Sequence, residues 1–368
     1  LATRQRYAIG VTFATALLAV LALHANQVHA LSTYVVLVGS TLVAVGLLSD
    51  IRTRTKLAMV GLLASIAAFT LSFFADLAMM QPEYALNSAI WAGVAAMTAS
   101  LLLQLLLPFL ERFFGIVTGM TLLEWCDINK PLLRRLAREA PGTYNHALVL
   151  GSMAEAAAES IGAHGLLTRV GAYYHDIGKI NKPRYFVENQ LAGANWHDRL
   201  SPTMSLLIII GHVKDGLELA REYGLPRVLW DFIGEHHGTT LVRYFYRQAA
   251  ERQGGQQVTE SDFRYPGPRP RSKETAILML CDSVESAVRS LSEPTPGRIE
   301  GLVHQMVMER LADGQFEDCD ITLRELHKVE ESIVKSLCAI YHGRIAYPSA
   351  REPAREAPRP KPAQAQTA

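Results

Sequence analysis

The chain has 368 residues, with 36 lysines and arginines against 35 aspartates and glutamates, so its formal net charge is +1. This balance leaves no excess of basic residues for a phosphate backbone, so we expect no nucleic-acid polymer as a partner. The cysteines, Cys126, Cys281, Cys319 and Cys338, form no CxxC pair. Their spacing argues against a disulfide framework and fits a reducing compartment.

The first third of the chain is predicted to lie in a lipid bilayer. Long stretches lack charged residues, and four apolar segments have the length of a membrane-spanning helix: 8–24, 31–49, 57–79 and 87–110. Basic residues gather before the first segment and between the second and third: Arg4, Arg6, Arg52, Arg54 and Lys56. Because basic loops stay on the cytoplasmic side, four crossings return the chain to the cytoplasm. We therefore expect a multi-pass protein of the inner (cytoplasmic) membrane.

One acidic residue, Asp76, interrupts the third apolar segment near its end. The simplest interpretation is an interfacial residue whose carboxylate extends out of the bilayer. A carboxylate within a membrane span is nevertheless a candidate functional group.

From residue 111 charged residues become frequent, and no alternating strand pattern stands out, so we expect an all-α fold. Residues 111–140 are interpreted as two connecting helices. Pro141-Gly142 then breaks the chain, and Thr143 can cap the helix that follows. We expect a soluble domain over 141–347. Residues 348–368 are predicted to be disordered, because alanine, proline and charged residues leave little to bury.

Seven side chains that can bind a metal lie on or at the ends of five predicted helices, mostly beside apolar faces: His146, His175, Asp176, His212, His236, His237 and Asp282. Each alone has an ordinary structural explanation, such as a packed core histidine or a cation at a helix end. Nitrogen and oxygen donors without a thiolate suit iron, manganese or a similar divalent ion. Seven ligands are enough for two ions that share Asp176. Lys179 follows on a glycine turn, where its ammonium can approach a bound phosphate.

Over about residues 111–347 the sequence resembles the seven-transmembrane HD family of bacterial cyclic-di-AMP phosphodiesterases. The predicted membrane spans match this family more loosely. The matching stretches are 141–146, 171–179, 185–190, 211–216, 235–239, 263–268 and 282–285. The resemblance implies a cytoplasmic, all-helical HD phosphohydrolase domain with Asp176 bridging two ions. One site would be completed by His146, His175 and Asp282, and the other by His212, His236 and His237. Since only four of the family's seven spans appear, we expect an N-terminally truncated chain.

The resemblance further implies a membrane-anchored phosphodiesterase that hydrolyses cyclic di-AMP to linear pApA with a water activated by two divalent ions, iron or manganese. Asp176 and Lys179 would be its catalytic residues. The predicted substrate contacts follow the metal motif or lie in a loop rich in proline and glycine: Arg184, Tyr185, Asn189, Gln190, Arg264 and Tyr265. The expected partners are a cyclic dinucleotide and the lipid bilayer, and a homodimer is left open.

Two other functions stay open at this point. One is an HD hydrolase of another nucleotide, such as cyclic di-GMP. The HD subfamily for that substrate carries Gly-Tyr-Pro after its paired histidines, whereas Gly238 is followed here by Thr239 and Thr240. The other is a non-catalytic membrane receptor that only binds nucleotide. It is disfavoured because a degenerate domain is expected to lose ligands, and all seven are present.

Overall fold

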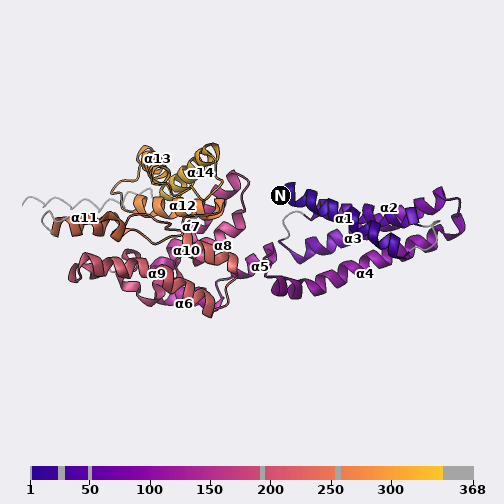
Figure 1. Ribbon diagram of the computed structural model, residues 1–368, viewed down its shortest axis with the longest axis horizontal. Helices are drawn as coiled ribbons and strands as arrows, with labels where there is room; N and C mark the ends of the chain where they lie inside the picture. Colours follow the sequence, from indigo (N-terminus) through magenta and orange to yellow (C-terminus); the bar gives the residue numbers. More distant parts are fainter. Residues whose placement is uncertain (1, 24–29, 49–51, 191–194, 253–257, 343–368) are drawn as a thin grey trace, which may run out of the picture.

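The computed structural model describes residues 2–23, 30–48, 52–190, 195–252 and 258–342. These residues form helices and one isolated antiparallel bridge, between Leu241 and Arg264, and include no strand. The all-α prediction is therefore confirmed. The helices of the first third lie together at one end of the molecule, and α5 (Gly119–Trp125) leads from them to the remaining helices (Figure 1).

The N-terminal helices are α1 (Ala2–Leu23), α2 (Ala30–Leu47), α3 (Arg54–Ala78) and α4 (Pro82–Phe114). By length and composition, α2, α3 and α4 can each cross a membrane, whereas the apolar part of α1, Tyr7–Ala22, is shorter. The four-span arrangement stays a prediction. Many large apolar side chains of these helices are exposed, as a lipid-facing surface requires, for example Leu102, Leu105 and Phe109.

The structure overturns the interfacial interpretation of Asp76. Its side chain is only 8% exposed. Helix α3 continues to Ala78, so Asp76 follows Ala68 and Ser72 at successive four-residue steps on one helix face, and all three are buried. The carboxylate thus faces the interior of the helix bundle instead of extending away from it.

The predicted break is confirmed at Ala140, one residue before Pro141-Gly142, but the predicted cap at Thr143 is wrong. After α6 (Pro131–Glu139), helix α7 (Pro141–Ser160) begins with Pro141 in its first turn, where a missing backbone N–H costs nothing. Thr143 is consequently inside the helix and does not cap it. Its hydroxyl donates a hydrogen bond to Glu188 Oε1 at 2.9 Å.

Two apolar clusters hold the helices that carry the predicted metal ligands. The first unites α7 with α12 (Lys273–Arg289), α13 (Pro296–Ala312) and α14 (Leu323–His342), and it includes Leu150 and Leu280. The second unites α6, α8 (Gly165–Tyr174), α9 (Pro202–Glu222) and α10 (Arg227–Glu235). The site lies where helices of both clusters meet.

Short elements complete the soluble part. They are the helix α11 (Arg243–Arg252) and the 3₁₀ turns η2 (Ile177–Asn181), η3 (Pro183–Tyr185), η4 (Val187–Asn189), η5 (Trp196–Arg199) and η6 (Glu260–Phe263). The tail predicted to be disordered, 348–368, lies outside the described residues.

Candidate metal centre

The structure brings all seven predicted ligands together. Two groups of four can each hold an ion, because one ligand atom from each member lies within 4.8 Å of the others: His146, His175, Asp176 and Asp282 form the first group, and Asp176, His212, His236 and His237 form the second. Asp176 belongs to both groups. Its Oδ2 lies 3.0 Å from His175 Nε2, and its Oδ1 lies 3.3 Å from His212 Nε2. Each carboxylate oxygen therefore faces a different group.

A close approach of backbones makes this arrangement possible. Helix α8 ends just before His175 and Asp176, and η2 then packs directly against α9. A Cβ atom on Gly178 would lie 1.8 Å from the carbonyl oxygen of His212 and 2.5 Å from the backbone nitrogen of Gly216. Only glycine permits this contact, which places Asp176 beside His212.

Backbone carbonyls orient three of the imidazoles. The Nδ1 atoms of His175, His212 and His236 lie 2.7, 2.5 and 3.0 Å from the carbonyl oxygens of Ala172, Ile209 and Ile233. Because a carbonyl oxygen can only accept a hydrogen bond, each Nδ1 carries the proton. Each Nε2 therefore faces Asp176, which is the orientation that a metal ligand requires.

His146 is oriented by a carboxylate. Its Nδ1 donates to Glu285 Oε2 at 2.8 Å, and its Nε2 lies 3.1 Å from Asp282 Oδ1. Arg289 in turn forms an ion pair with Glu285. Burial lowers the pKa of His146, but the hydrogen bonds to Asp282 and Glu285 outweigh it and raise the pKa to about 9. A divalent cation at Nε2 would take the place of this proton.

Two imidazoles of the second group, His212 and His237, have lowered pKa values. Burial lowers the pKa of His212 to about 3, and burial with the neighbouring His236 and His212 holds the pKa of His237 well below its ordinary value. Two buried atoms, His175 Nε2 and Asp176 Oδ1, make no hydrogen bond to any described residue. Buried polar atoms are rarely left so. Buried imidazole and carboxylate atoms with missing partners fit a pair of divalent ions.

Lys179 lies beside this centre, between two carboxylates. Its Nζ is 2.7 Å from Asp176 Oδ2 and 2.9 Å from Glu188 Oε1. Neither Glu188 nor Glu285 is among the site residues predicted from the sequence. Glu285 had a signal, because it follows Asp282 by three residues on the same helix face. Glu188 had none beyond its place in a matching segment.

Of the predicted substrate contacts, those near residue 190 are engaged within the protein. Asn189 Oδ1 accepts from the backbone nitrogen of Gly142 at 2.8 Å, and Gln190 Nε2 donates to the carbonyl of Arg184 at 3.1 Å. The Arg184 guanidinium lies over the Trp196 ring, which also meets the ring of Tyr185 edge-on. These contacts hold the loop in place, and binding of substrate by it stays a prediction.

The other two predicted contacts lie on the side of the paired histidines. Tyr265 stacks on His237, with ring centroids 4.2 Å apart. Arg264 pairs with Asp313 Oδ1 at 2.8 Å and donates to the carbonyl of Thr239 at 2.9 Å. Tyr265 therefore contacts the candidate ligand His237 directly, whereas Arg264 contacts the backbone two residues after it, at Thr239.

A cavity of about 770 Å³ adjoins the first group of ligands. Its lining includes the ligand His146, the carboxylates Glu188 and Glu285, and the side chains of Asn145 and Arg289. The volume suits a small-molecule ligand. Of the described residues that line it, none is one of the six predicted substrate contacts.

Comparison with known proteins gives two matches along the chain. Residues 143–287 match the family described as HD domain, and residues 3–118 match the family described as 7TM receptor with intracellular HD hydrolase. With its apolar helices, the second match identifies a membrane protein.

Individual relatives agree with this assignment. The chain is 49% identical over 257 residues to the cyclic-di-AMP phosphodiesterase PgpH of Bacillus subtilis, covering 70% of this chain and 36% of that protein. It is 39% identical over 352 residues to PgpH of Listeria monocytogenes, covering 95% and 48%. The chain thus spans less than half the length of these relatives.

A crystal structure of the L. monocytogenes PgpH HD domain in complex with cyclic-di-AMP superimposes with a TM-score of 0.57 at 47% identity. The match covers 58% of this chain and 100% of that domain. The chain therefore belongs to the HD-domain family, and its N-terminal helices match the family described as 7TM receptor with intracellular HD hydrolase.

Proposed function

We propose that this chain is a membrane-anchored, metal-dependent phosphodiesterase that hydrolyses cyclic di-AMP to linear pApA. The observation that carries the proposal is the pair of four-residue groups that share Asp176. The names of the two relatives and the HD domain crystallised with cyclic-di-AMP support the choice of substrate.

The proposed cofactors are two divalent ions, iron or manganese, one in each group of ligands. The imidazole and carboxylate donors without a thiolate support this choice. When bound, the ions supply positive charge to the phosphodiester and activate the attacking water. Asp176 holds the two groups together, since its two oxygens face different imidazoles.

Lys179 is proposed to donate to the phosphate. Two of its three N–H groups are directed at Asp176 and Glu188, which leaves one for a phosphate oxygen. We propose that substrate occupies the 770 Å³ cavity beside His146, where the Arg289 guanidinium lies close to the ligands. The six substrate contacts predicted from the sequence stay proposals alongside this one. The basic loop between α2 and α3 favours a cytoplasmic HD domain.

The decisive experiment replaces Asp176 by alanine in the full chain. Cyclic di-AMP hydrolysis is measured in detergent with Mn²⁺ or Fe²⁺ added back, and the products are separated by chromatography. We expect a loss of about 10² to 10³-fold, the usual cost of removing one preorganised electrostatic element. Undiminished turnover would refute the proposal.

A matched control is available in the second His-Asp pair of the chain. Asp198 follows His197 but is exposed and belongs to neither group of ligands. Asp198→Ala should leave turnover unchanged. Parallel reactions with cyclic di-GMP test the alternative substrate, and a protein that binds cyclic di-AMP with metal present but forms no pApA would favour the receptor alternative.

A further inference from the structure

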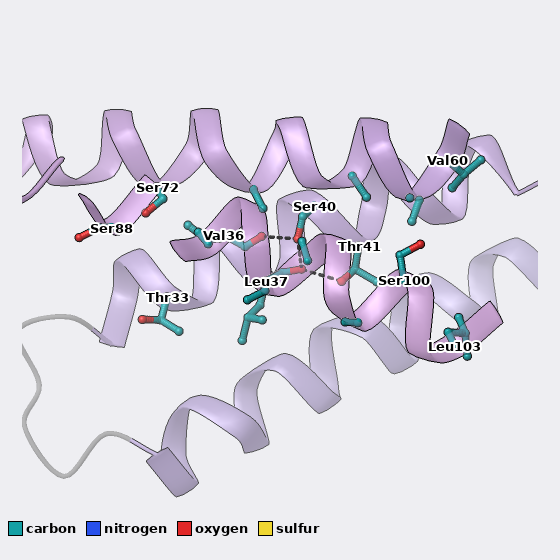
Figure 2. A pocket seen from close by; sticks show the side chains of 18 of the residues that line it. Thr33, Val36, Leu37, Ser40, Thr41, Val60, Ser72, Ser88, Ser100 and Leu103 are labelled. Carbon is teal, nitrogen blue, oxygen red and sulfur yellow. Dashed lines mark hydrogen bonds between the residues drawn. The ribbon is translucent and has the colours of Figure 1, made fainter. Parts of the chain in front are cut away.

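The membrane bundle contains a cavity of about 1060 Å³ between α2, α3 and α4. Side chains of all three helices line it, among them Ser40, Thr41 and Ser72 (Figure 2). No part of the proposed hydrolytic reaction uses it. Its volume is slightly above the usual range for small-molecule sites, which ends at about 1,000 Å³.

The lining is apolar apart from hydroxyl and amide groups and one carboxylate. Small residues of α3 and α4 make room for the cavity: Gly61, Ala64, Ala68, Ala92, Ala95, Ala96 and Ala99. Asp76 is the one charged residue among the described residues that line it, and lysine, arginine and histidine do not contribute. The cavity therefore offers a carboxyl group and no basic side chain among its described lining residues.

The hydroxyl groups of α2 are arranged as acceptors. Ser40 Oγ donates to the carbonyl of Val36 at 2.7 Å, and Thr41 Oγ1 donates to the carbonyl of Leu37 at 2.7 Å (Figure 2). Each hydroxyl proton is thus used within the helix, which leaves the oxygen lone pairs for another molecule. These two groups favour a ligand that donates hydrogen bonds.

Asp76 is the second, independent sign of a ligand. Its side chain is more than nine-tenths buried, and its Oδ2 makes no hydrogen bond to any described residue. Burial of a carboxylate without a partner is costly, and carboxylates in membrane helices ordinarily have one. The missing partner must donate hydrogen bonds or carry positive charge.

We propose that this cavity binds an organic amine whose ammonium group pairs with Asp76 and whose apolar body fills the space lined by alanines. A lone metal ion fits less well, because it needs several oxygen ligands around it and the volume is far larger than an ion occupies. An anion is excluded by the absence of basic groups from the described lining.

The position of Asp76 indicates which end of the cavity would hold the ammonium group. Asp76 lies in the last turn of α3, and the lining continues through Gln81 and Tyr84 at the turn into α4. This turn lies at the end of the bundle remote from the HD domain (Figure 1). The site is therefore separate from the metal centre.

The proposal is tested with n-octylamine as the probe and the full chain in phosphatidylcholine nanodiscs. Calorimetric titration, corrected with empty nanodiscs, should give saturable binding of one amine per chain. Octanol and octanoate have the same chain length without the ammonium, and we expect no saturable binding of either. Equal binding of octanol, or amine uptake that only matches the empty nanodiscs, would overturn the proposal.

Two variants locate the site. Asp76→Asn should weaken octylamine binding at least about tenfold, the loss typical of a charged hydrogen bond. Glu83→Gln is its matched control, because Glu83 is an exposed carboxylate at the same end of the bundle that does not line the cavity. Glu83→Gln should bind as the unchanged chain does, and equal affinity of the Asp76→Asn variant would contradict the proposal.

A third variant distinguishes loss of the binding site from loss of the folded structure. Ala96→Phe keeps Asp76 but fills part of the cavity, so octylamine binding should fall while helicity and the thermal midpoint are retained. Full binding by a folded Ala96→Phe variant would place the amine elsewhere and overturn the proposal.

Discussion

The metal centre and the membrane cavity both bury an aspartate, but they surround it differently. Burial opposes the charged form of Asp176, yet His175 and Lys179 hold its pKa well below the ordinary value. Asp76 has no such neighbour among the described residues that line its cavity. A buried carboxylate whose partners come from the protein belongs to a prearranged site. One whose partners are missing indicates a site that a ligand completes.

The largest expected effect tests how rigidly the metal centre is built. In Gly178→Ala the new methyl group would meet backbone atoms of His212 and Gly216, which cannot move without separating η2 from α9. We expect a loss of about 3 kcal/mol of stability or more and loss of bound metal from both groups. Thermal unfolding and metal analysis of the purified chain measure the two effects.

Two further glycines sharpen this test. A Cβ on Gly211, one residue before His212, meets nothing within 4 Å, so Gly211→Ala should leave stability equal or slightly higher. In the membrane bundle, Gly61→Ala meets the Ser100 side chain, with Oγ at 2.0 Å, and a side chain can rotate away. If Gly178→Ala proved no worse than Gly61→Ala, the difference in rigidity between the two regions would be contradicted.

The two groups of ligands should also respond differently to pH. A proton stays on His146 below pH 9, because its hydrogen bonds to Asp282 and Glu285 outweigh the effect of burial on its pKa. A cation must displace that proton, so affinity of the first group for Mn²⁺ should fall about tenfold per pH unit from pH 9 to 6. His212, with a pKa of about 3, is already neutral over this range. The second group should therefore show little dependence.

The same pKa values determine how the stability of the metal-free chain changes with pH. The raised pKa of His146 adds stability below about pH 6.5 that is lost as pH rises through 9. The lowered pKa of His212 gives stability that is present above about pH 6.5 and lost as pH falls toward 3.

Chelator competition at pH 6 to 9, with His146→Ala and His212→Ala to separate the groups, checks the metal prediction. Equal slopes for the two groups would contradict it.

A smaller effect is expected from Glu285, which contacts His146 and belongs to neither group of candidate ligands. Glu285→Gln weakens the acceptor for His146 Nδ1, so metal affinity of the first group should fall about 10 to 100-fold. Glu330→Gln is the matched control. His304 Nδ1 and Glu330 Oε1 form a similar pair, with the two atoms 2.9 Å apart, and neither residue belongs to the groups of candidate ligands. An unchanged affinity in the Glu285→Gln variant would show that packing alone orients His146.

The convergence of the seven candidate ligands could be predicted from the sequence, whereas the side chains that orient them could not. Imidazoles and carboxylates at the ends of apolar helices are visible along the chain, and the seven candidates meet in space. Glu285 lies 139 residues from His146, so their contact depends on how α7 and α12 pack. The burial of Asp76 was missed for a similar reason. A position near the end of an apolar segment does not reveal whether the helix continues and which face turns inward.

The smallest effect is expected from removing the Ser65 hydroxyl, which forms a hydrogen bond between α3 and α4. Ser65 Oγ donates to the carbonyl of Gly93 at 2.6 Å. Ser65→Ala should cost only about 0.6 kcal/mol, the average for a hydrogen bond between membrane helices, because the separated helices find other partners. Thr70→Ala is the control, since that hydroxyl bonds within its own helix. Unfolding in mild detergent measures both, and a loss of several kcal/mol at Ser65 would mean that the bundle, like the metal centre, is held by specific contacts.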